Sequence, residues 1–248
     1  MPADPRARFS GTVDAYDKHR PSYPAALIDW VLATSGVSAG AKAADVGCGT
    51  GISTRLLDER GLDVIGVDAN PDMLARARMH GGPVYQQAES HRTGLPSGAF
   101  DLVTVAQAFH WFDVEPTLAE FARILKPGAW VAAFWNHRTD ATPFMREYEA
   151  LLNSRCPEYP RSRDEVGVIG SIEASARVKD FTKAEFPNSQ VMDREGFLGR
   201  CYSCSYVVNG VPDPDALRQA FDELFDKHAG NGTIEFLYRT KGFCWRLR

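Results

Sequence analysis

Residues 43–51 read Ala-Ala-Asp-Val-Gly-Cys-Gly-Thr-Gly, so that a short apolar run passes directly into closely spaced glycines. The run over 42–46 predicts a buried strand, and residues 52–60, which end in a basic turn before a glycine, predict a helix. Glycines at such a junction let backbone amides approach a ligand beneath the helix N-terminus. Because ligands of open α/β sheets bind beyond the carboxyl ends of the strands, this stretch predicts a binding site there.

The chain around this stretch alternates between predicted strands and helices. Further strands are expected over 63–68, 84–88, 100–106 and 129–135, and helices over 24–35, 71–80 and 116–125. Such alternation with short links is typical of a doubly wound, mostly parallel α/β sheet with helices on both faces. Later in the chain we expect helices over 144–153, 193–205 and 214–228, and strands over 233–238 and 242–247 around a turn at Lys241-Gly242.

The spacing of glycines and acidic residues discriminates between classes of nucleotide. A dinucleotide fingerprint counted from Gly47 would need a third glycine where the chain has Ile52, and no Gly-Lys-Ser/Thr of a phosphate-binding loop follows. Asp68 ends the second strand, about 20 residues after the glycines, and can accept both hydroxyls of a ribose. The pattern favours a ligand with a ribose and no pyrophosphate, such as S-adenosylmethionine (SAM). The structural alternative is that Asp45 caps the turn and Asp68 caps the next helix.

Several segments, taken in order, resemble the class I SAM-dependent methyltransferases. They read DVGCGTG (45–51), VDANPDML (67–74), AE (88–89), LP (95–96), FD (100–101) and LKPG (125–128). Residues 90–94 depart from the commonest spacing of that family. The resemblance covers most of the chain and implies a seven-stranded, Rossmann-like methyltransferase sheet with an antiparallel C-terminal strand and an inserted helical cap.

The resemblance also implies which residues hold the cofactor. The glycine stretch would wrap the methionine part of SAM, Asp68 would bind the ribose, and the segment at Glu89 would close over the adenine. Residues 16–24 and the segment AQAFHWF over 106–112 look like the trans-aconitate methyltransferase subgroup, whose N-terminal tyrosine and arginine fold over the cofactor. The implied cofactor contacts are Tyr16, Arg20, Asp45, Gly47, Cys48, Gly49, Asp68, Ala69, Met73, Glu89 and Gln107.

Methyl transfer from a sulfonium requires alignment of the acceptor and exclusion of water. A carboxylate acceptor needs no base, whereas a phenol, amine or alcohol does. His110, after the fourth strand, is the candidate catalytic base, with a role in shape or hydrogen bonding as the alternative. Arg138 is a candidate to hold a carboxylate, with an exposed surface arginine as the alternative. The candidate substrate-binding residues are Trp111, Trp135, Arg138, Tyr202 and Tyr206.

The composition limits the partners that the chain is expected to have. Lys and Arg number 28 against 32 Asp and Glu, a net charge of -4, which disfavours nucleic acid and anionic membranes. The sequence lacks a transmembrane run and a secretory signal. Five scattered cysteines favour reduced thiols in a cytoplasm, and the lone C-x-x-C at 201–204 predicts no metal site. A small-molecule substrate is the expected partner, and the oligomeric state is left open.

We expect a single domain over 1–248, with 1–35 as an arm over the cofactor and 139–209 as a cap over the substrate. The leading hypothesis is SAM-dependent O- or N-methylation of a small molecule, with carboxylates among the acceptors. The alternatives are a non-catalytic SAM- or nucleoside-binding module, a nicotinamide-dependent oxidoreductase and a nucleic-acid methyltransferase. The intact loop over 106–112 disfavours the first of these, Ile52 the second and the acidic charge balance the third.

Overall fold

The computed structural model describes residues 17–159 and 165–248. One sheet contains the strands of this part of the chain, which are β1 (Lys42–Val46), β2 (Asp63–Asp68), β3 (Val84–Gln87), β4 (Phe100–Ala106), β5 (Leu125–Arg138), β6 (Val178–Met192) and β7 (Ile234–Leu247). Their order across the sheet is β3-β2-β1-β4-β5-β7-β6. Neighbours from β3 to β5 are parallel, whereas β7 is antiparallel to both β5 and β6. The predicted seven-stranded, mostly parallel α/β fold is therefore confirmed.

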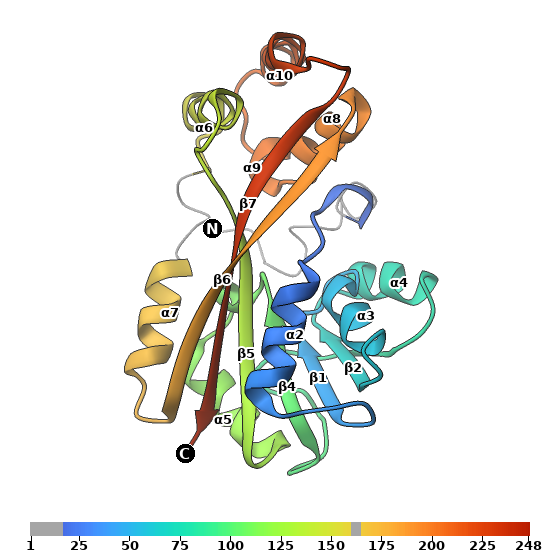
Figure 1. Ribbon diagram of the computed structural model, residues 1–248, viewed down its shortest axis with the longest axis vertical. Coiled ribbons are helices and arrows are strands. Elements are labelled where there is room, and N and C mark those ends of the chain that lie inside the picture. The colour runs from blue at the N-terminus through green and yellow to red at the C-terminus, as the bar shows by residue number, and fades with distance from the viewer. Residues whose placement is uncertain (1–16, 160–164) are drawn as a thin grey trace.

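Helices cover both faces of the parallel part of the sheet (Figure 1). They are α2 (Ala25–Ser35), α3 (Ile52–Asp58), α4 (Pro71–Met79), α5 (Val114–Ile124) and α7 (Glu165–Ala174). Successive residues of a strand point to opposite faces. Accordingly, Ala43 of β1 packs in the cluster that contains α2 and α3, whereas Ala44 packs in the cluster that contains α5. This two-sided burial explains why β1 and β4 are mostly apolar.

A second layer lies at the other end of the long strands β5, β6 and β7 (Figure 1). We call this the helical layer, and it consists of α6 (Pro143–Arg155), α8 (Arg194–Tyr202), α9 (Ser205–Val208) and α10 (Pro214–His228). Its core is aromatic, because Tyr148, Phe197, Phe221 and Phe236 are buried against one another. The segment 139–209, expected to be a substrate cap, supplies α6, α8 and α9 together with α7 and β6. Its role as a cap remains a prediction.

The expected turn at Lys241-Gly242 is wrong, because β7 runs without interruption through both residues. Gly242 pairs with Phe134 of β5, and a Cβ atom there would lie 2.7 Å from Cδ1 of Leu27 in α2. The glycine therefore provides room for a helix to approach the sheet, which is the other common reason for glycine within a strand.

Strand β6 lies in a stretch to which the sequence assigned no element. It forms the edge of the sheet, and most of its residues alternate between partly buried and exposed. Pro187 lies within it, which an edge strand tolerates because one side needs no hydrogen bonds. Within the described ranges, no helix combines the length and the apolar character that a bilayer-spanning segment needs.

Candidate active site

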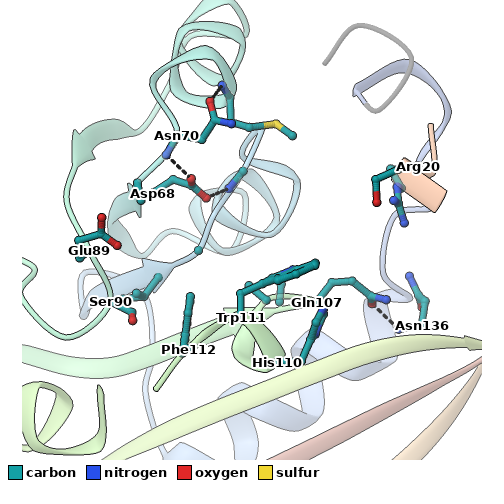
Figure 2. Close-up of a pocket in the computed structure, with 18 of the residues that line it drawn as sticks. Arg20, Asp68, Asn70, Glu89, Ser90, Gln107, His110, Trp111, Phe112 and Asn136 are labelled. Carbon is teal, nitrogen blue, oxygen red and sulfur yellow. Dashed lines mark hydrogen bonds between the residues drawn. The ribbon is translucent and has the colours of Figure 1, made fainter. Parts of the chain in front are cut away.

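A cavity of about 670 Å³ lies at the carboxyl ends of the parallel strands, between the sheet and the helical layer. This volume is within the range of roughly 300–1,000 Å³ that ligand pockets occupy. Loops after β1, β2, β3 and β4 and the last residues of β5 line it from the side of the sheet, and α8 and α9 line it from the helical layer. Figure 2 shows Asp68, Asn70 and Glu89 on one side of this cavity and Arg20 and Asn136 on the other.

The loop after β1 has a conformation that requires glycine. Gly47 has a φ of 75°, and a Cβ atom there would lie 2.6 Å from the Cβ atom of Ala108. The backbone N–H groups of Gly47 and Cys48 both donate to the carbonyl oxygen of Val67, at 2.7 and 3.1 Å. The loop is thereby held between the ends of β2 and β4, with its backbone at the cavity.

Asp68 joins this loop to the start of α4. One carboxylate oxygen, Oδ2, accepts from the backbone N–H of Gly49, and Oδ1 accepts from that of Asn70, both at 2.8 Å. The cap of α4 is Asn70, whose side chain accepts from Asp72 and Met73, so the alternative that Asp68 caps this helix is wrong. Burial raises the pKa of Asp68, although the two N–H donors oppose this effect. Its carboxylate lines the cavity and retains lone pairs for a ligand.

Asp45 lies beneath the loop rather than at the cavity. Its fully buried carboxylate accepts from the hydroxyls of Ser53 (2.6 Å), Thr54 (2.7 Å) and Thr104 (2.8 Å). Burial raises its pKa above the ordinary value, and the three hydroxyls oppose this shift. The side chain of Asp45 thus ties β1 to α3 and β4, which fixes the strand end that carries the glycines.

The loop after β4 contributes the middle of the cavity (Figure 2). Gln107 has a φ of 57°, unusual for a residue other than glycine, and its Oε1 accepts from the backbone N–H of Asn136 at 2.8 Å. Trp135 Nε1 donates to Nδ1 of His110 at 3.3 Å, which assigns the ring proton to Nε2. Burial, and then the charge of Arg20, lower the pKa of His110 to about 4. His110 is therefore a neutral hydrogen-bond donor near pH 7, and its low pKa makes it a weak base.

Arg138 lies at the end of β5 and is buried, with its side chain 4% exposed, so the alternative of a surface arginine is wrong. Its Nε donates to Oε1 of Glu149 at 2.6 Å. Its two other nitrogens donate to the hydroxyls of Tyr206, at 3.2 Å, and Tyr159, at 2.8 Å. The guanidinium is thus fixed by an ion pair and two phenols, and the residue still lines the cavity.

The cavity brings together twelve of the residues singled out from the sequence. They are Arg20, Gly47, Gly49, Asp68, Ala69, Met73, Glu89, Gln107, His110, Trp111, Arg138 and Tyr206. Four others lie outside its lining: Asp45 lies beneath the glycine loop, the side chain of Cys48 packs in the small cluster with Leu74, Ala77 and Tyr85, Trp135 is buried behind His110, and Tyr202 packs against Phe221. Tyr16 lies outside the described residues.

Sequence reasoning missed several residues that line the cavity. They are Asn70, Ser90, His91, Arg200 and Ser205 among others, whereas Asn136 and His137 line the cavity at the end of the fifth strand, where the sequence places them. Of these, Arg200 had a detectable signal, since it is the only charged side chain in the apolar and aromatic segment 197–206. No cluster of His, Cys, Asp or Glu that could hold a metal occurs within the described part of the chain.

Comparison with known proteins identifies relatives. Residues 44–133 match the family described as Methyltransferase domain. An uncharacterized methyltransferase of Mycobacterium tuberculosis is 39% identical over 146 residues, which cover 58% of this chain and 58% of that protein. The chain thus matches less than two thirds of the length of this curated relative.

Solved structures extend the likeness to nearly the whole chain. A candidate type II methyltransferase from Anaeromyxobacter dehalogenans is 27% identical, with a TM-score of 0.65 over 91% of this chain and 95% of that one. The phosphoethanolamine N-methyltransferase 2 of Haemonchus contortus, solved with phosphomonomethylethanolamine and S-adenosylhomocysteine, has a TM-score of 0.56 at 17% identity. This match covers 96% of this chain and 57% of that one, and it concerns the fold alone.

Proposed function

We propose that this chain, which has the fold of the class I SAM-dependent methyltransferases and carries their domain at residues 44–133, binds SAM and methylates a small-molecule acceptor. The observation that carries the proposal is the position of Asp68. Its carboxylate lines the cavity while it holds Gly49 of the glycine loop and the first residues of α4. A ribose bound by this carboxylate would lie next to the backbone N–H groups of the glycine loop. This is the arrangement expected for a ligand with a ribose and no pyrophosphate.

The cofactor half of the cavity is formed by Gly47, Gly49, Asp68, Met73 and Glu89. Its two carboxylates suit a ligand with an ammonium and a sulfonium, because opposite charges within a buried site attract strongly. The glycine loop would hold the methionine part, Asp68 the ribose and Met73 one face of the adenine. We assign the cofactor carboxylate to Arg20, which faces the cavity from the opposite side (Figure 2).

The acceptor half is formed by His110, Trp111, Arg138, Arg200 and Tyr206. SAM, held by the cofactor half, would supply an electrophilic methyl group with a neutral thioether as its leaving group. Trp111 would exclude water from the path of transfer, which positioning catalysis requires. His110 would donate from Nε2 and orient the acceptor. An acceptor that is already ionised suits this half, since burial makes His110 a weak base and such an acceptor needs none.

Calorimetric titration tests the proposal. We expect S-adenosylhomocysteine and SAM to bind and NAD not to bind. Asp68→Ala should weaken binding of S-adenosylhomocysteine by about 1–3 kcal/mol, because charged hydrogen bonds to the ribose are lost. The matched control is Asp72→Ala, which removes an exposed carboxylate in the first turn of α4. Preference for NAD, or equal affinity in Asp68→Ala and the control, would contradict the assignment.

A further inference from the structure

Trp135 of β5 is buried behind the cavity and contacts a residue that lines it. The side chain is fully buried and packs edge-on against Phe243 of β7, with ring centroids 5.9 Å apart. Its indole nitrogen, Nε1, donates to Nδ1 of His110 at 3.3 Å, and His110 lines the cavity. A buried indole N–H without an acceptor would be costly. This hydrogen bond therefore connects a core side chain to the acceptor half of the cavity.

The contact with Trp135 decides which nitrogen of His110 is available to a ligand. An indole N–H only donates, so Nδ1 is the nitrogen without a proton and the ring proton lies on Nε2. Burial, and then the charge of Arg20, lower the pKa of His110 to about 4, so the ring is neutral near pH 7. The lone pair that could take a proton from a substrate is thus already occupied. The polar group that remains for a ligand is Nε2–H.

Packing of the imidazole would not by itself select this orientation. His110 lies against Trp111, with ring centroids 4.9 Å apart and the two planes inclined by 46°. Such a contact restrains the plane of the imidazole, but a half-turn of the ring about its bond to Cβ preserves that plane. After the half-turn a carbon atom would face Trp135, and the buried indole N–H would lose its acceptor. The hydrogen bond therefore selects one of two orientations that packing alone would permit.

Strand β5 holds the loop that carries His110 through three consecutive residues. The carbonyl oxygen of Phe134 accepts from the backbone N–H of Gln107 at 2.9 Å. The backbone N–H of Asn136 donates to Oε1 of Gln107 at 2.8 Å (Figure 2). Between these two residues, Trp135 contacts His110. The backbone of the loop is thus fixed by its neighbours, and the indole fixes the side chain that the loop presents to the cavity.

We propose that Trp135 is a positioning residue for methyl transfer, whose indole N–H holds His110 in one tautomer and one orientation, with Nε2–H as a fixed donor to the methyl acceptor. The inference rests on the proposed function, because it takes the acceptor to bind beside His110. Trp135 itself touches no ligand and acts through the imidazole. A donor that is oriented before the acceptor binds needs no reorganisation during the reaction.

The first experiment observes the ring nitrogens of His110 by NMR of protein with labelled histidine, loaded with S-adenosylhomocysteine. In the natural chain we expect a proton on Nε2 and none on Nδ1 from pH 6 to 8. Trp135→Phe keeps an aromatic ring and removes the donor, so the Nδ1 and Nε2 shifts should move toward each other as both tautomers become populated. The matched control is Trp245→Phe. Trp245 is equally buried in the same core, but its indole nitrogen has no hydrogen-bond partner among the residues that the structure describes.

The second experiment measures methyl transfer from labelled SAM to a library of phenols, amines, thiols and carboxylates. With the best acceptor of this library, we expect Trp135→Phe to lower kcat tenfold or more and to change the KM for SAM less than twofold. Trp245→Phe should change both constants less than twofold. A selective fall in kcat is expected because the substitution disturbs a donor to the acceptor and leaves the cofactor half intact.

The possible results separate this inference from the proposed function. A proton on Nδ1 of His110 in the natural chain, or an unchanged tautomer in Trp135→Phe, overturns the role of Trp135. An equal loss of kcat in Trp245→Phe does so too, because it would reduce the effect to core packing. Transfer to no member of the library by the natural chain counts against the proposed function, and NMR still decides how His110 is held. If Trp135→Phe does not fold, the natural chain decides: the indole proton of Trp135 should resonate downfield of that of Trp245, and the reverse order overturns the contact.

Discussion

The cofactor half of the cavity consists largely of main-chain groups at the ends of β1 and β2, whereas the acceptor half consists of long side chains from distant segments. Gly47 and Gly49 act through backbone geometry that a short stretch of sequence specifies by itself. Arg138 and Arg200 instead line the same cavity because Arg138 lies over the ring of Tyr148 and α8 packs in the aromatic core that contains this ring. The difference teaches that the first half has a local sequence signature and the second has none. It also predicts that the two halves respond differently to substitution.

The largest expected effect is that of Gly47→Ala, which disrupts the cofactor half alone. The new methyl group would lie 2.6 Å from Ala108 Cβ and 2.8 Å from the ring of Phe112, at a φ that favours glycine. We expect affinity for S-adenosylhomocysteine to fall by on the order of 100-fold or more, about 3 kcal/mol, measured by calorimetry. The control is Gly36→Ala, which has a similar φ but open space around it, at the end of α2. Retained affinity in Gly47→Ala would show that the loop is more adaptable than its contacts indicate.

Arg138→Met is the matching disruption of the helical layer. It removes the ion pair with Glu149 and leaves that carboxylate partly buried, which we expect to lower the free energy of unfolding by about 3 kcal/mol. Adding Glu149→Gln should recover part of the loss, whereas affinity for S-adenosylhomocysteine should change little. Denaturant melts of both variants give the first quantity and calorimetry the second. A large loss of cofactor affinity would mean that the two halves are coupled more closely than their construction suggests.

His110, at the boundary between the halves, gives the smallest of these effects and one that depends on pH. Its pKa of about 4 in the folded protein is below the ordinary 6.5, so the unfolded chain binds the proton more readily between these values. Stability is therefore complete above pH 6.5 and decreases as pH falls through 6.5 toward 4, by roughly 2 kcal/mol after allowance for partial exposure. His110→Gln should flatten this dependence. NMR of labelled histidine measures the pKa directly, and titration of His110 near 6.5 would contradict the assignment.

Much of the parallel half could be predicted from the sequence because each of its strands is apolar and followed by a turn or a helix. The bounds expected for β1, β2 and β4 match those observed. The edge strand β6 was missed, since one of its faces is polar and it contains Pro187. Strand β7 was divided in two because Gly242 reads as a turn residue, although its function is to admit α2.

The candidate site also contains residues that a local sequence pattern identifies and residues whose role depends on distant segments. Asp68 was singled out because a carboxylate at a strand end next to glycines is a local pattern, and it lies at the cavity. Asp45 belongs to that pattern too, but its three hydroxyl partners come from β4 and α3, which spacing does not show. Arg200 was missed because its significance depends on the absence of a neighbouring carboxylate. Only the assembled fold shows that no carboxylate of the described chain reaches it.

The pairing of β5 with β7 continues from Trp130 opposite Arg246 to Arg138 opposite Tyr238. The core of the helical layer and the two larger cores of the parallel part all include residues of β7. Because the helical layer packs on strands that continue into the parallel part, we expect the two to unfold together. We therefore expect both sides of the cavity to form and to be lost in one cooperative transition, and a change that weakens either side to weaken the pairing of β5 with β7 as well.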